Sequence, residues 1–147
     1  MLEIRMSRPS EASGIIQIWK RSVEATHDFL TAPDRHEIEK EVVSFFSATP
    51  VWVATNQADQ PLGFMFLHDG HLEALFVDAA ARGLGVGKRL ISHALALHPD
   101  LSVDVNEQNQ QAVGFYQHMG FQISGRSGRD NQGRPYPLLH LTIANKA

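Results

Sequence analysis

The sequence predicts an α/β fold: a mixed, mostly antiparallel sheet in the element order βααβββαβαββ, with one parallel strand pair. Three observations predict this class. Short runs alternate apolar and polar residues, which is typical of half-buried strands. Other segments repeat apolar residues every three or four positions, which is typical of amphipathic helices. Between residues 71 and 105, a strand, a glycine-rich loop, a helix and another strand follow one another, and such a crossover implies a parallel pair.

The first third of the chain predicts one strand and two helices. Residues 2–6 alternate as a strand, and a helix opens at Pro9-Ser10. A second helix begins near Thr31, whose hydroxyl can cap the first turn, and Pro33 suits that turn. The apolar stripes of these helices comprise Ala12, Ile15, Ile16, Trp19 and Val23 in the first, and Ile38, Val42 and Phe45 in the second.

The middle of the chain predicts an antiparallel meander followed by the crossover. Residues 51–55, 62–67 and 71–77 are the meander strands, joined by the polar turn NQADQP and by Asp69-Gly70. A helix over about 86–97 follows, and residues 101–105 alternate as the next strand. One face of that helix carries Val86, Leu90, Ala94 and Leu97.

The last third predicts a short helix and two closing strands. The helix covers about 109–118 and ends at Gly120, which suits a left-handed cap. The strands cover 121–123 and 137–143, around a DNQG turn.

Composition favours a single domain over residues 1–147. The chain has 16.3 kDa, 43% hydrophobic residues and no cysteine, which excludes a disulfide scaffold, a zinc-thiolate site and a cysteine nucleophile. A net charge of −3 gives no general attraction to nucleic acid or anionic lipid. No apolar run reaches the ~20 residues of a membrane span, and the start lacks a signal-peptide pattern. We therefore expect a cytoplasmic monomer or homodimer, with no nucleic-acid or membrane partner.

The segment from Arg82 to Lys88, RGLGVGK, lies between a predicted strand and a predicted helix. Glycines there let main-chain N–H groups turn toward an anion, and the helix N-terminus adds partial positive charge. A P-loop would need Gly in place of Arg82 and Ser or Thr in place of Arg89, and a dinucleotide loop would need Gly in place of Lys88. The loop is thus expected to bind a phosphate of another kind of ligand, unless its glycines only form a tight turn.

The pattern Arg82-x-x-Gly85-x-Gly87 resembles the pyrophosphate-binding loop of the GNAT superfamily of N-acetyltransferases. The flanking stretches 75–95 and 105–121 resemble the two coenzyme-binding segments of that family in order and spacing. The predicted element order also matches the family, so the likeness covers essentially the whole chain, and it is strongest to small bacterial stand-alone members. The resemblance implies the GNAT fold, with its parallel pair splayed at an acetyl-CoA site.

The resemblance also implies where acetyl-CoA, the cosubstrate, would bind. The pantetheine arm would pair with the main chain of 75–77 like an added strand, and the diphosphate would bind the glycine loop. Asn109 is equally well placed to cap the following helix. The cofactor-binding residues so implied are Leu75, Phe76, Val77, Arg82, Gly83, Leu84, Gly85, Val86, Gly87, Lys88, Asn106, Asn109 and Tyr116.

Tyr116 matches the position of the family's general acid. A phenol with a pKa near 10 stays protonated at neutral pH and can donate to a leaving thiolate whose conjugate acid has a pKa near 8.5. The alternative is an aromatic residue that only packs beside Phe115.

Glu73 is the candidate general base. An acceptor ammonium with a pKa of about 10.4 must lose its proton before attack, at a cost of about 4.6 kcal/mol at pH 7. In many members of the family that this sequence resembles, a residue of the corresponding strand supplies the base, usually through water. Leu75 and Val77 share the face of Glu73, so we expect its side chain to be partly buried, the alternative being a solvent-facing acid.

The acceptor site is expected between the first two helices and before the last strand, with His27, Phe29 and Tyr136 as substrate-binding residues. His27 has a plainer interpretation as a surface residue. The eight histidines show no HExxH or HxH pairing, so we expect no metal. We expect direct transfer of acetyl to a primary amine of a small molecule, peptide or protein. The alternative is a non-catalytic module that binds or senses acyl-CoA.

Overall fold

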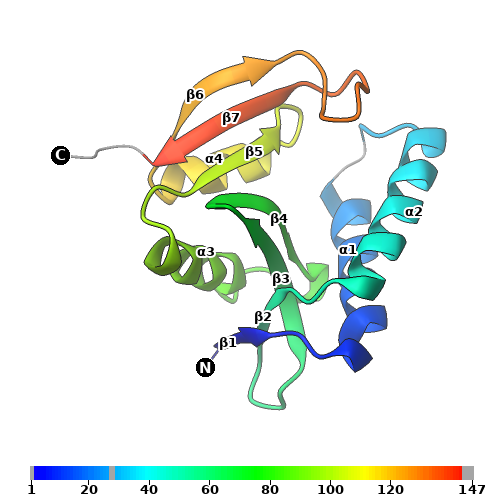
Figure 1. The fold of residues 1–147 in the computed structure, drawn as a ribbon, viewed down its shortest axis with the longest axis vertical. Coiled ribbons are helices and arrows are strands. Elements are labelled where there is room, and N and C mark those ends of the chain that lie inside the picture. The colour runs from blue at the N-terminus through cyan, green and yellow to red at the C-terminus, as the bar shows by residue number, and fades with distance from the viewer. Residues whose placement is uncertain (1, 27–28, 144–147) are drawn as a thin grey trace. The chain divides into compact units, whose positions relative to one another are not determined.

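The computed structural model describes residues 2–26 and 29–143. In this part of the chain it has the predicted order of strands and helices, βααβββαβαββ (Figure 1). The strands are β1 (Glu3–Met6), β2 (Trp52–Thr55), β3 (Pro61–His68), β4 (His71–Val77), β5 (Ser102–Asn106), β6 (Phe121–Ser127) and β7 (Leu138–Ile143). The helices are α1 (Ala12–Thr26), α2 (Ala32–Ala48), α3 (Val86–Leu97) and α4 (Gln110–His118).

The seven strands form one mixed sheet in the order β1-β2-β3-β4-β5-β7-β6. The predicted parallel pair is confirmed, since β4 runs parallel to β5. The chain forms two compact units. The first takes in the chain up to Phe66 together with Ala74–His93, and the second takes in Leu67–Glu73 and the chain from Ala94 on. Strand β4 therefore contributes residues to both units.

In the first unit, α1 and α2 lie side by side and pack on strands β2 and β3 through an apolar core (Figure 1). The Thr31 hydroxyl accepts a hydrogen bond from the Asp34 N–H at 3.2 Å, which confirms the predicted cap of α2. The predicted opening of the first helix at Pro9 begins as a 3-10 turn, Pro9–Glu11, before α1. The buried residues of this core include Ile15, Ile18, Trp19, Val53 and Phe64.

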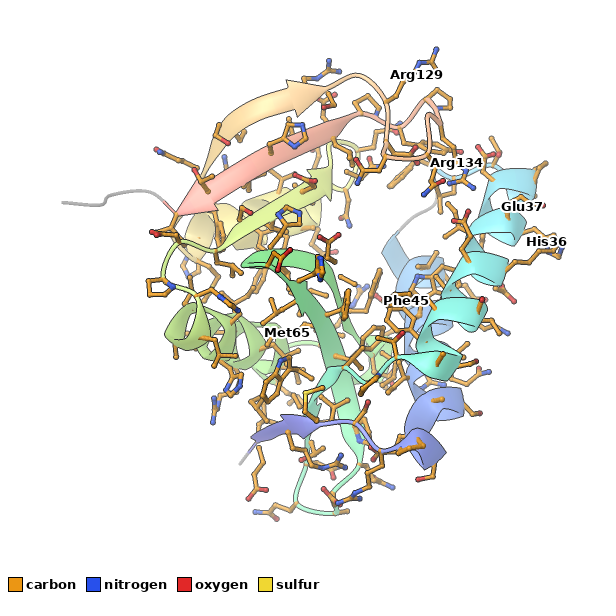
Figure 2. All side chains as sticks on the ribbon, viewed as in Figure 1. His36, Glu37, Phe45, Met65, Arg129 and Arg134 are labelled. Atoms are coloured by element: carbon orange, nitrogen blue, oxygen red, sulfur yellow. The ribbon has the colours of Figure 1, made fainter. Side chains whose placement is uncertain are left out.

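The predicted stripe of α2 is wrong at its last position. Phe46 is buried, with 7% of its surface exposed, whereas Phe45 is 41% exposed. Ile38, Val42 and Phe46 form one i, i+4 row along the helix, and Phe45 lies off that row. Phe45 instead lies at the border of the core (Figure 2), and its ring centre is 4.9 Å from that of the partly buried Phe66.

In the second unit, β5 pairs with β7 and β7 pairs with β6, both antiparallel, while α4 packs against β5 and β6. The alternating residues Val103 and Val105 are buried, as predicted. Strand β6 is longer than predicted, since it continues past Ile123 to Ser127. The reason is its register with β7, which resumes after an irregularity between Ile123 and Gly125 and pairs a polar segment that the hydrophobic pattern does not reveal.

Helix α3 has the predicted bounds, and its buried residues are Val86, Leu90, Ile91 and Ala94. The expectation for Leu97 is wrong, because its side chain is 47% exposed. Leu97 is the last residue of the helix and lies off the i, i+4 row of Val86, Leu90 and Ala94. Within the described residues, no helix is both long enough and apolar enough to cross a bilayer.

Two leucines of α3 give a matched test of this burial pattern. Leu90→Ala should lower the free energy of unfolding by about 2–5 kcal/mol, because Leu90 is fully buried. Leu97→Ala should change it by less than about 1 kcal/mol. Urea unfolding followed by circular dichroism measures both, and equal losses would contradict the packing described here.

Candidate active site

The parallel register between β4 and β5 consists of two pairs, His71 with Ser102 and Leu72 with Val103. Leu75, Phe76 and Val77 lie beyond these pairs on β4, and all three side chains are half-buried. The predicted main-chain role of these residues requires β4 to continue past its pairing with β5. The strand meets this requirement, since it runs on to Val77.

The glycine loop connects β4 to α3. Gly83 and Gly85 have φ angles of 82° and 79°, in the left-handed region that residues with a side chain adopt only under strain. Arg82, Leu84 and Lys88 are exposed, and buried Val86 begins α3. The loop therefore needs glycine for its conformation, and it presents cationic side chains beside a helix N-terminus, a combination suited to a phosphate group.

Tyr116 lies on α4 with 6% of its surface exposed. Its ring makes edge contacts with Phe115 and Phe121, at centroid distances of 5.3 and 5.6 Å. Burial raises the pKa of the phenol well above its usual value near 10. The group therefore keeps its proton across the neutral range, as a general acid requires.

A cavity of about 220 Å³ lies in the second unit, and Glu73 is part of its wall. The expectation of a partly buried Glu73 is wrong, since the side chain is exposed. Leu72 points to the buried face of β4 and Glu73 to the opposite face, next to the end of the pairing with β5. The residues that line the cavity are His71, Leu72, Glu73, Asp104, Asp130, Asn131, Gln132 and Leu138.

Beside Glu73, a chain of polar side chains crosses four strands of the second unit. Asp104 on β5 contacts two imidazoles, His140 Nδ1 at 2.7 Å and His71 Nε2 at 3.4 Å. Each histidine also contacts a serine hydroxyl, His140 with Ser127 at 2.7 Å and His71 with Ser102 at 2.6 Å. With the proton on Nδ1, the His140 ring donates to Asp104 and accepts from the Ser127 hydroxyl at Nε2. Asp104 is thereby held in place at the cavity wall.

Sequence reasoning missed this chain of side chains. The alternation of β5 places Asp104 on the outward face, and that signal is present in the sequence. Its histidine partners depend on the strand register, which pairs Asp104 with His140 and Ser102 with His71. No local pattern encodes that register.

The two asparagines after β5 both act on the local main chain. Asn109 Oδ1 accepts from the Ala112 N–H at 3.2 Å and is the N-cap of α4. Asn106 Oδ1 accepts from the Gln108 N–H at 2.9 Å. Each amide keeps its Nδ2 as a donor, and contact with a coenzyme stays a prediction for both.

Of the three residues expected at the acceptor site, two lie in the described part of the chain, and they differ in burial. His27 lies outside the described residues, Phe29 is half-buried and Tyr136 is buried. Their role in substrate binding stays a prediction. In the part of the chain that the structure describes, no group of three or more His, Asp and Glu side chains is arranged to hold a metal ion.

Comparison with known proteins gives the class. A family model of the acetyltransferase (GNAT) domain matches residues 19–137. The peptidyl-lysine N-acetyltransferase YjaB of Escherichia coli is 53% identical over 141 residues, covering 96% of both chains. The solution structure of its apo form covers 99% of both chains, with a TM-score of 0.94 and 52% identity. This chain belongs to the GNAT family of acetyltransferases.

The chain is thus an N-acetyltransferase that transfers an acetyl group to an amine, and the expected resemblance and fold class are confirmed. The non-catalytic alternative finds no support. Members of the family use acetyl-CoA. The fold is shared with the PaiA N-acetyltransferase of Thermoplasma acidophilum in complex with coenzyme A, at a TM-score of 0.67, 16% identity and coverage of 95% and 98% of the two chains.

The cap of α4 can be tested separately from any coenzyme contact. Asn109→Ala should lower the free energy of unfolding by about 1 kcal/mol, because the Ala112 N–H loses its partner. Asn109→Asp should retain most of the stability, since a carboxylate caps equally well. Urea unfolding measures both variants, and an unchanged stability of Asn109→Ala would show that the cap contributes nothing.

Proposed function

We propose that this enzyme transfers the acetyl group of acetyl-CoA to the ε-amino group of lysine residues in peptides or proteins. The observation that carries the choice of acceptor is the cavity, where Glu73 is joined by Asp104 and Asp130. Asp130 also lies 4.0 Å from Arg134 Nη1, so the attraction comes mainly from Glu73 and Asp104, and it favours an acceptor that arrives as an ammonium ion. The YjaB relative, a peptidyl-lysine N-acetyltransferase, supports the same class of acceptor.

For the donor, the proposal assigns the diphosphate of acetyl-CoA to the main-chain N–H groups and cations of residues 82–88. The positive φ angles of Gly83 and Gly85 and the start of α3 at Val86 support it. The pantetheine amides would pair with the main chain of Leu75, Phe76 and Val77, and the Nδ2 groups of Asn106 and Asn109 are further donors.

The proposed reaction is a direct transfer. Glu73, through a water molecule, takes a proton from the acceptor ammonium, and the free amine attacks the thioester carbonyl carbon. A C–N bond forms, the C–S bond breaks, and the phenol of Tyr116 gives its proton to the leaving thiolate. The nitrogen then loses its second proton, which returns through water to the Tyr116 phenolate, and Glu73 releases the first proton to solvent. Most of the acceleration would come from holding the two substrates together.

We also propose that residues 1–147 act as one acetyltransferase domain in the cytoplasm. The relative with 53% identity covers 96% of the chain, and the family model covers most of it. Phe29 and Tyr136 are proposed to contribute to the acceptor side, together with His27.

The acceptor and the base can be tested together. The enzyme should acetylate lysine-containing peptides with acetyl-CoA, measured by mass spectrometry. Glu73→Gln should lower kcat/KM by about 100-fold at pH 7. The loss should shrink near pH 10, where about a third of the free lysine is already deprotonated.

The matched control is Glu37→Gln, since Glu37 is an exposed carboxylate on α2 (Figure 2). It should leave kcat/KM unchanged. A Glu73→Gln enzyme with wild-type kcat/KM at pH 7 would remove Glu73 from the mechanism. Acetylation of free amines but of no lysine peptide would overturn the proposed acceptor.

Tyr116→Phe tests the proposed acid. It should lower kcat by about 100-fold, because the leaving thiolate loses its proton donor, while the KM for acetyl-CoA stays within about twofold. In the wild type, kcat should not fall through loss of the phenolic proton up to pH 10, because burial raises the pKa of Tyr116 above its usual value. Initial rates with a thiol reagent measure both, and an unchanged kcat would contradict the assignment.

A further inference from the structure

A buried carboxylate stands where β4 ends and the connection to the glycine loop begins. Asp78 is 9% exposed. Among the described residues that are buried, it is the one that carries a carboxylate. It lies four residues before Arg82, the first residue of the glycine loop. Carboxylates are rarely buried without a partner, so we expect Asp78 to be paired and hydrogen-bonded.

Asp78 fixes the main chain on both of its sides. Its N–H donates to the carbonyl of Leu62 on β3 at 2.8 Å, which fixes the end of β4. Its Oδ1 accepts from the Ala80 N–H at 3.2 Å, and its carbonyl accepts from the Ala81 N–H at 2.8 Å. These two bonds hold the 3-10 turn Ala79–Ala81, which leads directly into Arg82 and Gly83.

The carboxylate is held in turn by Arg21 of α1 through two hydrogen bonds. Arg21 Nε donates to Oδ1 at 3.0 Å and Nη2 donates to Oδ2 at 2.7 Å. This fork-shaped pairing restricts the carboxylate in both position and orientation. Hydrogen bonding to Arg21 lowers the pKa of Asp78 below its usual value, so the pair stays ionised at neutral pH.

The pair also matters for charge. An unpaired Asp78 would place a negative charge in a poorly solvated position, a few residues from the segment proposed to bind a diphosphate, and would repel that ligand. The guanidinium of Arg21 cancels this charge and leaves the cations and N–H groups of residues 82–88 to act on the anion.

We propose that Arg21 and Asp78 are positioning residues for the diphosphate of the acyl donor: their ion pair holds the start of the glycine loop in its binding conformation and neutralises the carboxylate beside it. The inference rests on the proposed function of that loop. It assigns a role in donor recognition to Arg21, a half-exposed residue of α1 that belongs to neither coenzyme-binding segment of the sequence.

The test compares two donors, acetyl-CoA and acetyl-pantetheine. They share the thioester and the pantetheine arm, but acetyl-pantetheine lacks the diphosphate and the 3′-phosphoadenosine attached to it. Arg21→Gln should raise the KM for acetyl-CoA about tenfold, a factor equivalent to one charge-assisted hydrogen bond. The KM for acetyl-pantetheine and both kcat values should stay within about twofold of the wild type. Asp78→Asn should have a smaller effect than Arg21→Gln, because it removes the repelling charge together with the ion pair.

Glu11→Gln is the matched control for a merely structural role. Glu11 forms another ion pair with two hydrogen bonds in the same unit, with Arg5 Nη1 and Nη2 donating to its two oxygens at 2.9 and 2.8 Å. Its loss should lower the melting temperature but leave the preference for acetyl-CoA over acetyl-pantetheine unchanged. Arg21→Lys, which keeps the charge, should recover part of that preference.

The outcomes separate the inference from the function on which it rests. A wild type without any preference for acetyl-CoA would overturn the proposed role of the glycine loop itself. A wild type with that preference, together with an Arg21→Gln variant that keeps it in full, would overturn the positioning role alone. Equal losses of preference in Arg21→Gln and Glu11→Gln would show that the effect is one of general stability, which also contradicts the inference.

Discussion

The structure depends on one short interaction, the parallel pairing of β4 with β5 at His71–Ser102 and Leu72–Val103. Parallel neighbours cannot be joined by a tight turn, so the chain must leave β4, cross over through a helix and return. That crossover contains the glycine loop and α3. The loop proposed to bind the acyl donor therefore lies on a connection that the sheet topology requires, and Arg21 and Asp78 fix the point where it begins.

Most of the fold was predictable because periodicity and turn chemistry are local. The cap at Thr31, the turn at Asp69-Gly70 and the bounds of α3 follow from a few neighbouring residues each. The error at Phe45 arose because the adjacent positions Phe45 and Phe46 fit the same apolar stripe, and tertiary packing buries Phe46. The error at Leu97 arose at the last residue of α3, whose side chain is 47% exposed.

The candidate site likewise has features that local sequence predicts and features that only long-range strand pairing sets. The glycine loop was predictable because Gly83 and Gly85 have a conformation that the residue type itself permits. The exposure of Glu73 and the contacts of Asp104 with His71 and His140 depend on where strand pairing ends and on cross-strand register. These are long-range properties that a local pattern does not carry.

The central claim is that the main chain around residues 82–88 binds the diphosphate of the acyl donor. A titration of the 15N-labelled protein with coenzyme A, followed residue by residue in amide NMR spectra, measures this. The amides of Gly83, Gly85 and Val86 should show some of the largest shifts, and pantetheine alone should leave them nearly unmoved. Saturable binding that leaves those amides unmoved would contradict the account.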